Sequence, residues 1–204
     1  MLLRANQHKQ MAWKNGGGVT SEIARAPNNE QEDFDWRLSI AQVKSPGGAF
    51  SVFPGIDRTL CVVSPNELYL TVEGSSGNII HLNQNSLPYS FAGESSITCQ
   101  IQSETLTDFN VMTRRTKFRH DVERMKMELK QEKKINALAN DEEIMFIIVG
   151  QGQVVTNDGI QMAIGDALQI DQQHSSDIKI SAQTENTQLY IVRLNPILSK
   201  ENVE

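Results

Sequence analysis

Apolar and polar residues alternate with a period of two along much of this chain, and this pattern most constrains what the chain can fold into. From Phe34 to Ala41, apolar Phe34, Trp36, Leu38 and Ile40 alternate with their neighbours, and residues 68–73 and 125–130 repeat the pattern. Such runs are typical of strands with one buried face. Turns rich in glycine, proline and asparagine separate them, so the sequence predicts an all-β sandwich or barrel.

Two segments are open to more than one interpretation. Val122, Met125 and Leu129 also fit one face of a helix, although we prefer a strand over residues 122–129. Residues 131–141 are polar, which fits either one short helix or an ordered linker.

A weak internal repeat indicates two similar halves. In each half a pair of strands is followed by a turn of glycine and an acidic residue, Gly93-Glu94 and Gly165-Asp166, that enters another strand. Turns of this kind recur in cupin barrels, where we expect the glycine to adopt a positive φ. We therefore predict a bicupin, with two cupin-like β-barrels of the jelly-roll type in one chain. The predicted units are an N-terminal barrel over residues 1–112, a linker over 113–121 and a C-terminal barrel over 122–204. The alternative is two unrelated β meanders.

Charge and composition exclude several classes of protein. The net charge of −6 argues against nucleic-acid binding, which needs clustered lysine and arginine. One short basic run, Arg114 to Arg119, is followed at once by Asp121 and Glu123, so we interpret it as a solvated loop. No signal peptide and no membrane-spanning run is apparent. Cys61 and Cys99 lie in apolar stretches and are expected to be free thiols in a reducing compartment, so we predict a cytoplasmic location.

The histidines lack the spacing of a cupin metal site. Such a site needs two histidines one residue apart, a nearby glutamate and a later histidine. The chain has His8, His81, His120 and His174, and none lies within four residues of another. We therefore predict no bound metal and no cofactor. The sequence also lacks the motifs of a serine nucleophile and of a phosphate-binding loop.

A triple glycine, Gly16 to Gly18, follows Asn15. It fits a hairpin turn in which Asn15 and Gly16 form a type I′ pair. It also fits a backbone that closely approaches a ligand. The sequence leaves both interpretations open.

Two arginines occupy unusual places in the strand pattern. Arg37 lies between Trp36 and Leu38, and alternation puts Arg58 on the same face as the apolar residues that follow it. A guanidinium on an apolar face needs a partner. That partner is either an internal carboxylate, from Asp35, Asp57 or Asp108, or an anionic ligand that the planar fork of arginine binds through two hydrogen bonds.

The segment 108–112 adds a further candidate wall. Asn110 and Met112 share one strand face there, a combination that suits a small polar ligand. Asn110 also fits a purely structural role at a strand edge.

Five ordered segments, residues 13–23, 34–41, 50–58, 91–93 and 108–112, resemble the HutD/Ves family. The second half resembles the family only in its β pattern. The resemblance implies a bicupin fold without a cupin metal site. In HutD members it implies a link to histidine utilisation, where a regulatory protein binds a pathway carboxylate such as urocanate or formylglutamate. Ves members are linked to stress or cold and have no assigned chemistry. The ligand-binding candidates carried over on these motifs are Trp13, Asn15, Thr20, Arg37, Ser39, Phe53, Arg58, Asn110 and Met112.

The leading hypothesis is a metal-free, non-enzymatic binding protein for a small carboxylate, housed in the N-terminal barrel. Arg58 holds the carboxylate, Arg37 and Asn110 support it, and Trp13 and Phe53 supply apolar walls. One alternative is a metal-independent cupin isomerase, lyase or hydrolase that uses Glu22 or Asp57 as general acid or base. Another is a structural or partner-binding protein whose second barrel forms a homodimer by covering strand edges. No nucleic-acid or membrane partner is expected.

Overall fold

The computed structural model describes residues 1–28, 33–74, 79–170 and 177–198, and these residues form an all-β fold, as predicted. The first half of the described chain comprises β1 (Leu2–Leu3), the 3-10 helix η1 (Ala5–Gln7), β2 (Lys9–Ala12), β3 (Gly18–Ala26), β4 (Trp36–Lys44), β5 (Gly47–Ala49), β6 (Ile56–Val62), β7 (Leu68–Val72), β8 (Ile79–Leu82), β9 (Tyr89–Ala92), β10 (Ile97–Ile101) and β11 (Thr105–Arg114). The second half comprises β12 (Phe118–Met127), β13 (Glu132–Ile135), β14 (Ile144–Gln151), β15 (Gln153–Thr156), β16 (Gln161–Ala163), β17 (Ala167–Ile170), β18 (Ile178–Ala182) and β19 (Thr187–Pro196). None of the described helices is long and apolar enough to cross a membrane.

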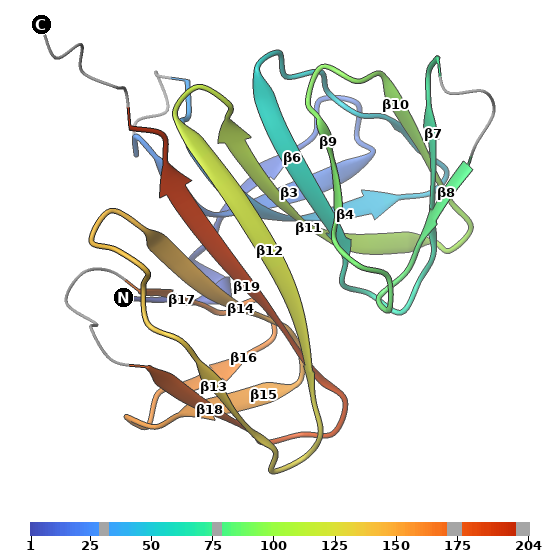
Figure 1. The fold of residues 1–204 in the computed structure, drawn as a ribbon. Coiled ribbons are helices and arrows are strands. Elements are labelled where there is room, and N and C mark those ends of the chain that lie inside the picture. The colour runs from blue at the N-terminus through green and yellow to red at the C-terminus, as the bar shows by residue number, and fades with distance from the viewer. Residues whose placement is uncertain (29–32, 75–78, 171–176, 199–204) are drawn as a thin grey trace, which may run out of the picture.

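The strands form four antiparallel sheets, two in each half of the chain (Figure 1). The first half holds a six-stranded sheet, β2-β3-β4-β11-β6-β9, and a four-stranded sheet, β5-β10-β7-β8. The second half holds a five-stranded sheet, β1-β17-β14-β19-β12, and a four-stranded sheet, β13-β18-β15-β16. Within the described residues every sheet is open, so the two closed barrels that the sequence predicts are not confirmed.

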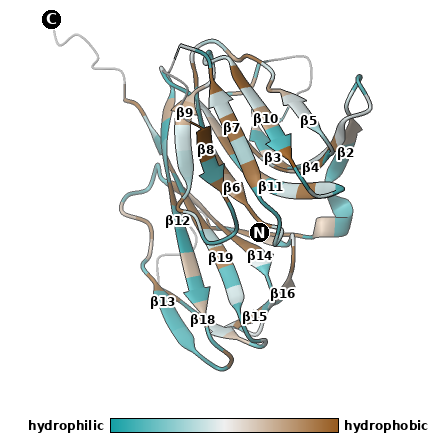
Figure 2. Ribbon diagram, turned by 90° about the vertical axis from the view of Figure 1, so that its right-hand side faces the viewer, coloured by the Kyte–Doolittle hydropathy of each residue, from teal (hydrophilic) through white to brown (hydrophobic). Residues whose placement is uncertain are grey.

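Three apolar cores hold the four sheets together. One lies between the two sheets of the first half, around Leu60 and Leu70, and a second lies between the two sheets of the second half, around Met145 and Ile147. Figure 2 shows the corresponding alternation, with brown residues separated by paler ones along strands such as β7. The third core joins the halves, because the six-stranded and five-stranded sheets pack against each other through their other faces.

The third core explains where the period of two fails. In β14, Met145 and Ile147 face the second-half core, whereas Phe146 and Ile148 face the junction between the halves. Both faces of this strand are buried, so the apolar run is continuous. Aromatic pairs span the junction: Trp36 meets Phe146 and Phe109 meets Tyr190, each with ring centroids 5.5 Å apart.

Of the two ambiguous segments, the first forms a strand and the second forms one in part. β12 includes Val122 and Met125, which confirms the preferred strand, and Leu129 lies in the turn that follows it. In the segment 131–141, the expectation of a helix or linker is wrong for residues 132–135, which form β13 and pair with β18. Only Ile135 of this strand is buried, so its sequence looks like that of a polar loop.

The connection between the halves is shorter than the expected linker over residues 113–121. Thr113 and Arg114 end β11, a turn occupies residues 115–117, and β12 begins at Phe118. In addition, β1 pairs with β17, so the N-terminus lies in a sheet of the second half (Figure 1). The division of the chain into two barrel units stays a prediction.

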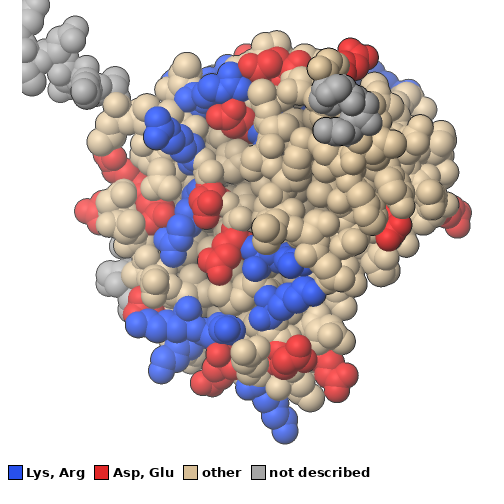
Figure 3. Space-filling view, turned by 45° about the vertical axis from the view of Figure 1, so that its right-hand side comes forward, with Lys and Arg blue, Asp and Glu red and all other residues tan. Residues whose placement is uncertain are grey.

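Two arginines of the basic run beside this turn pair with carboxylates. Arg115 Nε lies 2.8 Å from Asp57 Oδ1, and Arg115 Nη1 lies 2.9 Å from Glu94 Oε1. Arg114 Nε lies 3.6 Å from Asp35 Oδ1. On the face shown in Figure 3, basic and acidic side chains are likewise interspersed.

The two turns of glycine and acid differ in their backbone. Gly165 has a φ of +84°, as expected, and the Asp166 carboxylate accepts hydrogen bonds from backbone amides and from Arg4. Gly93 does not have a positive φ, so the expectation is wrong there. A Cβ atom at Gly93 would lie 2.6 Å from the Phe53 carbonyl oxygen, so glycine is needed at this position for a close backbone approach.

His120 connects the two halves through partly buried hydrogen bonds. From β12, its Nε2 lies 2.8 Å from Thr59 Oγ1 on β6, and its Nδ1 lies 2.7 Å from Thr113 Oγ1 on β11. Burial lowers the pKa of His120, and Asp57 and Asp121 oppose this effect only in part. The folded protein therefore resists protonation of this ring more than the unfolded chain does.

We expect His120 to make the protein less stable in mild acid. Because the pKa is lowered by folding, its contribution is fully present above the unfolded pKa of about 6.5 and is lost as the pH falls through the folded pKa. Asp108, described below, has a raised pKa and contributes in the opposite direction, so the wild type must be compared with His120→Gln. Urea unfolding between about pH 5 and 7.5 should show the stability advantage of the wild type shrinking as pH falls. His81→Gln, at an exposed site, is the control, and a difference that is independent of pH would contradict this assignment.

Candidate functional site

One cavity of about 700 Å³ in the first half of the chain brings the predicted site residues together. Its lining includes Trp13, Asn15, Thr20, Arg37, Ser39, Phe53, Arg58, Asn110 and Met112, which are all the candidates named from the sequence. That these residues bind a ligand stays a prediction. These residues come from segments up to about one hundred residues apart, and the pairing of strands brings them together at one cavity.

The register of three neighbouring strands places the polar groups. β11 lies between β4 and β6, with Met112 opposite both Arg37 and Arg58, and Asn110 opposite Ser39. Because side chains alternate across a strand, these residues all project from the same face of the sheet. The opposite face of β11 carries Phe109 and Val111, which belong to the core at the junction between the halves.

Arg58 is a buried cation without an ion-pair partner in the described part of the chain. It is 8% exposed, and its guanidinium donates from Nη1 to the Ser51 carbonyl oxygen at 3.2 Å and from Nη2 to Asn110 Oδ1 at 3.0 Å. Its Nε is buried and has no hydrogen-bond partner among the described residues. Burial lowers the pKa of Arg58 from 12.5 to about 10, with Asp108 opposing this effect and Arg37 adding to it.

Three phenylalanine rings surround this guanidinium. The Arg58 Cζ atom lies 4.9 Å from the ring centroid of Phe91, 5.2 Å from that of Phe50 and 5.6 Å from that of Phe53. Aromatic faces attract a cation, but they carry no negative charge that could form an ion pair with it. The rings thus stabilise the cation partially without accepting hydrogen bonds from its N–H groups.

None of the three carboxylates considered as internal partners of Arg58 contacts its guanidinium directly. Asp57 pairs with Arg115 and Asp35 with Arg114. Asp108 accepts a hydrogen bond from Asn110 Nδ2 at 2.8 Å, so its link to Arg58 runs through the Asn110 side chain. Burial raises the pKa of Asp108 from 3.8 to about 6, and the hydrogen bond from Asn110 and the charge of Arg58 oppose this effect.

Arg37, in contrast, has a direct carboxylate neighbour. Its Nε lies 2.8 Å from Glu22 Oε2 on β3, although this N–H is not aligned for a hydrogen bond. Burial lowers the pKa of Arg37, and Glu22 opposes this effect. Arg37 therefore contributes a compensated charge, whereas the buried Arg58 has no direct carboxylate partner among the described residues.

The triple glycine belongs to the β2–β3 hairpin at the edge of the cavity. Trp13 N–H donates to Gly18 O at 2.9 Å, and Gly16 N–H donates to Trp13 O at 3.0 Å. Gly16 has a φ of +72°, but Asn15 is not among the described residues with positive φ, so the expected type I′ pair is wrong. Two residues with negative φ followed by a glycine with positive φ form a longer loop instead.

Trp13 is held in place by this hairpin. Its Nε1 donates to Thr20 Oγ1 at 2.8 Å. Gly18 lies beneath the indole, because a Cβ there would approach Trp13 Cδ2 to 3.0 Å and the Gln42 carbonyl oxygen to 2.6 Å. The glycine run thus forms a hairpin, and Gly18 allows close packing at the cavity wall; a close approach of its backbone to a ligand stays a prediction.

Sequence reasoning missed several lining residues. Asp108 and Phe50 line the cavity, as do Met11, Ala12, Lys14, Ala41, Ala49 and Ser51. The signal for Asp108 was available, because a period of two puts it on the same face as Asn110 and Met112. It was considered only as a salt-bridge partner, and burial on that face gives it a larger role.

The two carboxylates proposed as general acid or base do not suit that role. Glu22 is held beside Arg37. Asp57 lies on the other face of β6 from Arg58 and pairs with Arg115 at the surface. Among the described residues that line the cavity, Asp108 is the one carboxylate.

The described histidines are spread over different parts of the fold. His8 follows η1, His81 lies on β8 beside Glu67, and His120 lies on β12. His174 lies outside the described residues. In the described ranges, no group of three or more histidine, cysteine or acidic side chains is arranged to hold a metal ion.

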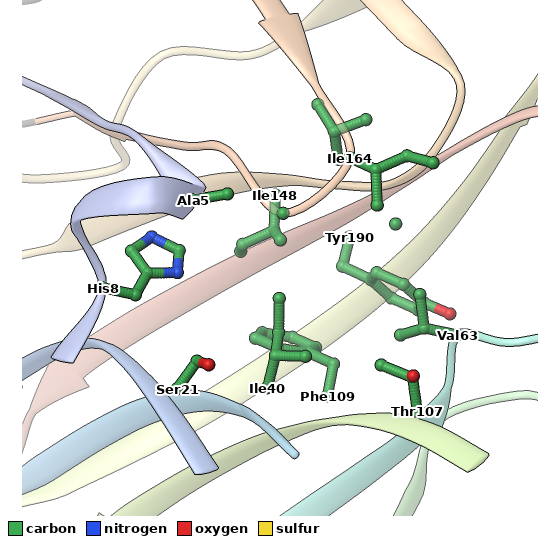
Figure 4. A pocket seen from close by; sticks show the side chains of 13 residues that line it. Ala5, His8, Ser21, Ile40, Val63, Thr107, Phe109, Ile148, Ile164 and Tyr190 are labelled. Atoms are coloured by element: carbon green, nitrogen blue, oxygen red, sulfur yellow. The ribbon is translucent and has the colours of Figure 1, made fainter. Parts of the chain in front are cut away.

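A smaller cavity, of about 180 Å³, lies between the two halves (Figure 4). Figure 4 shows the side chains of Ile40, Phe109, Ile148 and Tyr190 around it, with the ring of His8 at one side. No lysine or arginine is among its described lining residues. An anion is therefore better accommodated in the larger cavity.

The fold is similar to that of solved structures that include a bacterial pirin. The Escherichia coli protein YhhW superimposes with a TM-score of 0.69 over 98% of this chain and 99% of its own, at 13% identity, which shows the fold alone. A family model described as HutD matches residues 5–189, so the chain belongs to the HutD family.

Individual relatives agree with this membership. The structure of HutD from Pseudomonas fluorescens SBW25 covers 97% of this chain and 99% of its own at 27% identity, with a TM-score of 0.75. An uncharacterized 21.2 kDa protein in the hutC 3′ region of Pseudomonas putida is 38% identical over 54% of this chain and 56% of its own length. The protein Ves of Cronobacter sakazakii is 36% identical over 54% of this chain and 58% of its own length. The alignments thus span little more than half the length of these two curated relatives.

Proposed function

We propose that this chain binds a small carboxylate in the cavity of its first half, as a metal-free binding protein. One observation carries the proposal: Arg58 is a buried cation at the cavity, it has no carboxylate partner in the described residues, and its Nε has no hydrogen-bond partner there. Desolvating an unpaired charge is costly, and a bound carboxylate offsets that cost with charge-assisted hydrogen bonds. Asn110 and Ser39 supply further polar groups beside it.

The walls suit a ligand with a planar or apolar part. Trp13, Phe50 and Phe53 line the cavity together with Met11 and Met112. A pocket with few polar groups and aromatic walls orients an amphipathic small molecule. Urocanate and formylglutamate, both pathway carboxylates of histidine utilisation, are our candidates, and we propose a regulatory role there.

The comparisons support this context but not a particular ligand. The Pseudomonas putida relative is named for its place in the hutC 3′ region. The Pseudomonas fluorescens HutD structure is described with the words "formate condition". Formate is itself a carboxylate. A stress-linked role of the Ves type is the alternative within the family, because Ves proteins match the chain at similar identity.

We further propose that each pair of sheets corresponds to one cupin-like barrel. The support is that every sheet draws its strands from one half of the chain, apart from β1. A two-residue strand is a small exception to this division.

The test is calorimetric titration with urocanate, with N-formylglutamate and with the amide of urocanate, which lacks the negative charge. We expect the two carboxylates to bind with a stoichiometry near one and the amide to bind at least about tenfold more weakly, since it loses the charge-assisted hydrogen bonds. Equal affinity for urocanate and its amide, or no binding of any of these carboxylates, would refute the proposal.

One observation favours a second candidate function, a metal-independent isomerase, lyase or hydrolase. Asp108 lines the cavity, and its pKa of about 6 suits proton transfer near neutral pH. Incubation of the protein with each pathway carboxylate, followed by chromatography, distinguishes the two: turnover that disappears in Asp108→Asn supports an enzyme, and unchanged ligand supports a binding protein.

A further inference from the structure

Asp108 lies close to the cation that we assign to the ligand, yet it does not pair with that cation directly. Asp108 is 3% exposed, and its Oδ1 accepts a hydrogen bond from Asn110 Nδ2 at 2.8 Å. The oxygen of the same Asn110 amide, Oδ1, accepts a hydrogen bond from Arg58 Nη2 at 3.0 Å. Asn110 therefore separates a buried carboxylate from a buried guanidinium and orients both.

The two arginines of the cavity each have an opposite charge nearby before any ligand arrives. Arg58 and Asp108 form one set of opposite charges, and Arg37 and Glu22 form another. Lys14 also lines the cavity but is exposed to solvent. An anionic ligand beside Arg58 adds a negative charge near Asp108 in a place where little water screens the two, and like charges in such a site disfavour ionisation of both.

We propose that the cavity takes up its carboxylate ligand together with one proton from solvent, which Asp108 holds. This inference rests on the proposed function. The proton binds to Oδ2, so Oδ1 continues to accept from Asn110 and the orientation of Arg58 is preserved. The ligand then pairs with Arg58, and the neutral Asp108 no longer repels it.

Neighbouring groups do not compete for this proton near neutral pH. Arg58 on β6 and Arg37 on β4 remain protonated, and Glu22 on β3 is held beside Arg37. Burial raises the pKa of both thiols that interact with Asp108, Cys61 on β6 and Cys99 on β10, so both remain neutral. The pKa of Asp108, about 6 without ligand, leaves it mostly ionised in the free protein at pH 7.5 and therefore able to gain a proton.

The experiment is calorimetric titration with N-formylglutamate, whose carboxylates stay ionised over the pH range used, unlike the imidazole of urocanate. At about pH 7.5, titrations in buffers of different ionisation enthalpy give the number of protons taken up, which we expect to lie between about one half and one. The affinity should fall by up to about tenfold for each pH unit between pH 7 and 8, and proton uptake should disappear well below pH 6.

Asp108→Asn is the matched variant, because its amide has the shape of the protonated acid but does not titrate. It should bind N-formylglutamate at pH 8 at least as tightly as the wild type does, with no proton uptake. Asp57→Asn, at the surface, should keep the uptake of the wild type. Since the buffer series is measured on the unmodified chain, the conclusion does not depend on whether Asp108→Asn folds.

The outcomes separate this inference from the proposed function. Tight binding with less than about one fifth of a proton taken up at pH 7.5 overturns the inference and leaves the proposed function standing. Uptake that persists in Asp108→Asn also overturns it, because another group then holds the proton. The absence of any binding overturns the proposed function and this inference together.

Discussion

Replacing Arg58 by alanine is expected to weaken carboxylate binding at least about tenfold, or about 1.4 kcal/mol, while leaving the ligand-free protein as stable as the wild type or more stable. The loss of affinity follows from removing the charge-assisted hydrogen bonds of the guanidinium, each of which contributes about 1.5–3 kcal/mol. Calorimetry with N-formylglutamate measures the first effect, and urea unfolding without ligand measures the second.

The expected stability of the variant follows from the lowered pKa of Arg58. Folding lowers this pKa from 12.5 to about 10, so the charged form is disfavoured in the fold by about 3 kcal/mol. The charge of Arg58 therefore opposes folding at every pH below about 10, where the arginine is charged in both the folded and the unfolded state. Loss of the ring contacts, which are worth about 0.5–2 kcal/mol, offsets part of the gain. The two effects together leave the free energy of unfolding unchanged or raised.

Arg115→Ala is the matched control, because it removes a guanidinium that pairs with Asp57 and Glu94 at the surface. It should change stability by less than about 1 kcal/mol and leave ligand affinity unaltered. A structural role for Arg58 would give the reverse of our expectation, namely a much less stable ligand-free protein with unchanged affinity. That result would remove Arg58 from the site.

Among the variants proposed here, Phe146→Ala should lower the free energy of unfolding most, by about 3–5 kcal/mol. Phe146 is fully buried, and its ring meets that of Trp36 across the junction between the halves at a centroid distance of 5.5 Å. Truncation leaves a cavity between two sheets that are each fixed by a second core, so the site cannot collapse to fill it. Urea unfolding measures the free energy difference.

Leu87→Ala serves as the comparison, since Leu87 is 78% exposed and its truncation should matter by less than about 0.5 kcal/mol. We also expect Phe146→Ala to unfold in one transition if the junction is part of a single cooperative core. A loss below about 1 kcal/mol would contradict the packing of the six-stranded sheet against the five-stranded sheet.

Strand alternation predicted the placement of some of the site residues but not of all. Alternation in β6 put Arg58 on the face of Leu60, and alternation in β11 put Asn110 and Met112 together; the structure confirms both placements. The family motifs between residues 13 and 58 named six further lining residues in advance, Trp13, Asn15, Thr20, Arg37, Ser39 and Phe53. Asp108 was misjudged because its charge suggested an ion pair, whereas its burial and its hydrogen bond to Asn110 depend on the strands on either side of β11.

By itself the sequence determined the all-β class and the strand faces of Arg58, Asn110 and Met112, because a period of two is a local property of an extended backbone. Only the tertiary structure determined that the sheets remain open, that residues 132–135 pair as a strand, that β1 joins the second half, and that the halves share a core around Phe146 and Tyr190. It also determined that Arg58 has no direct carboxylate partner in the described part of the chain, while Asp57 and Asp35 pair elsewhere. The physical reason is that burial, pairing and electrostatic partners arise from contacts between residues far apart in the chain, which no local pattern specifies.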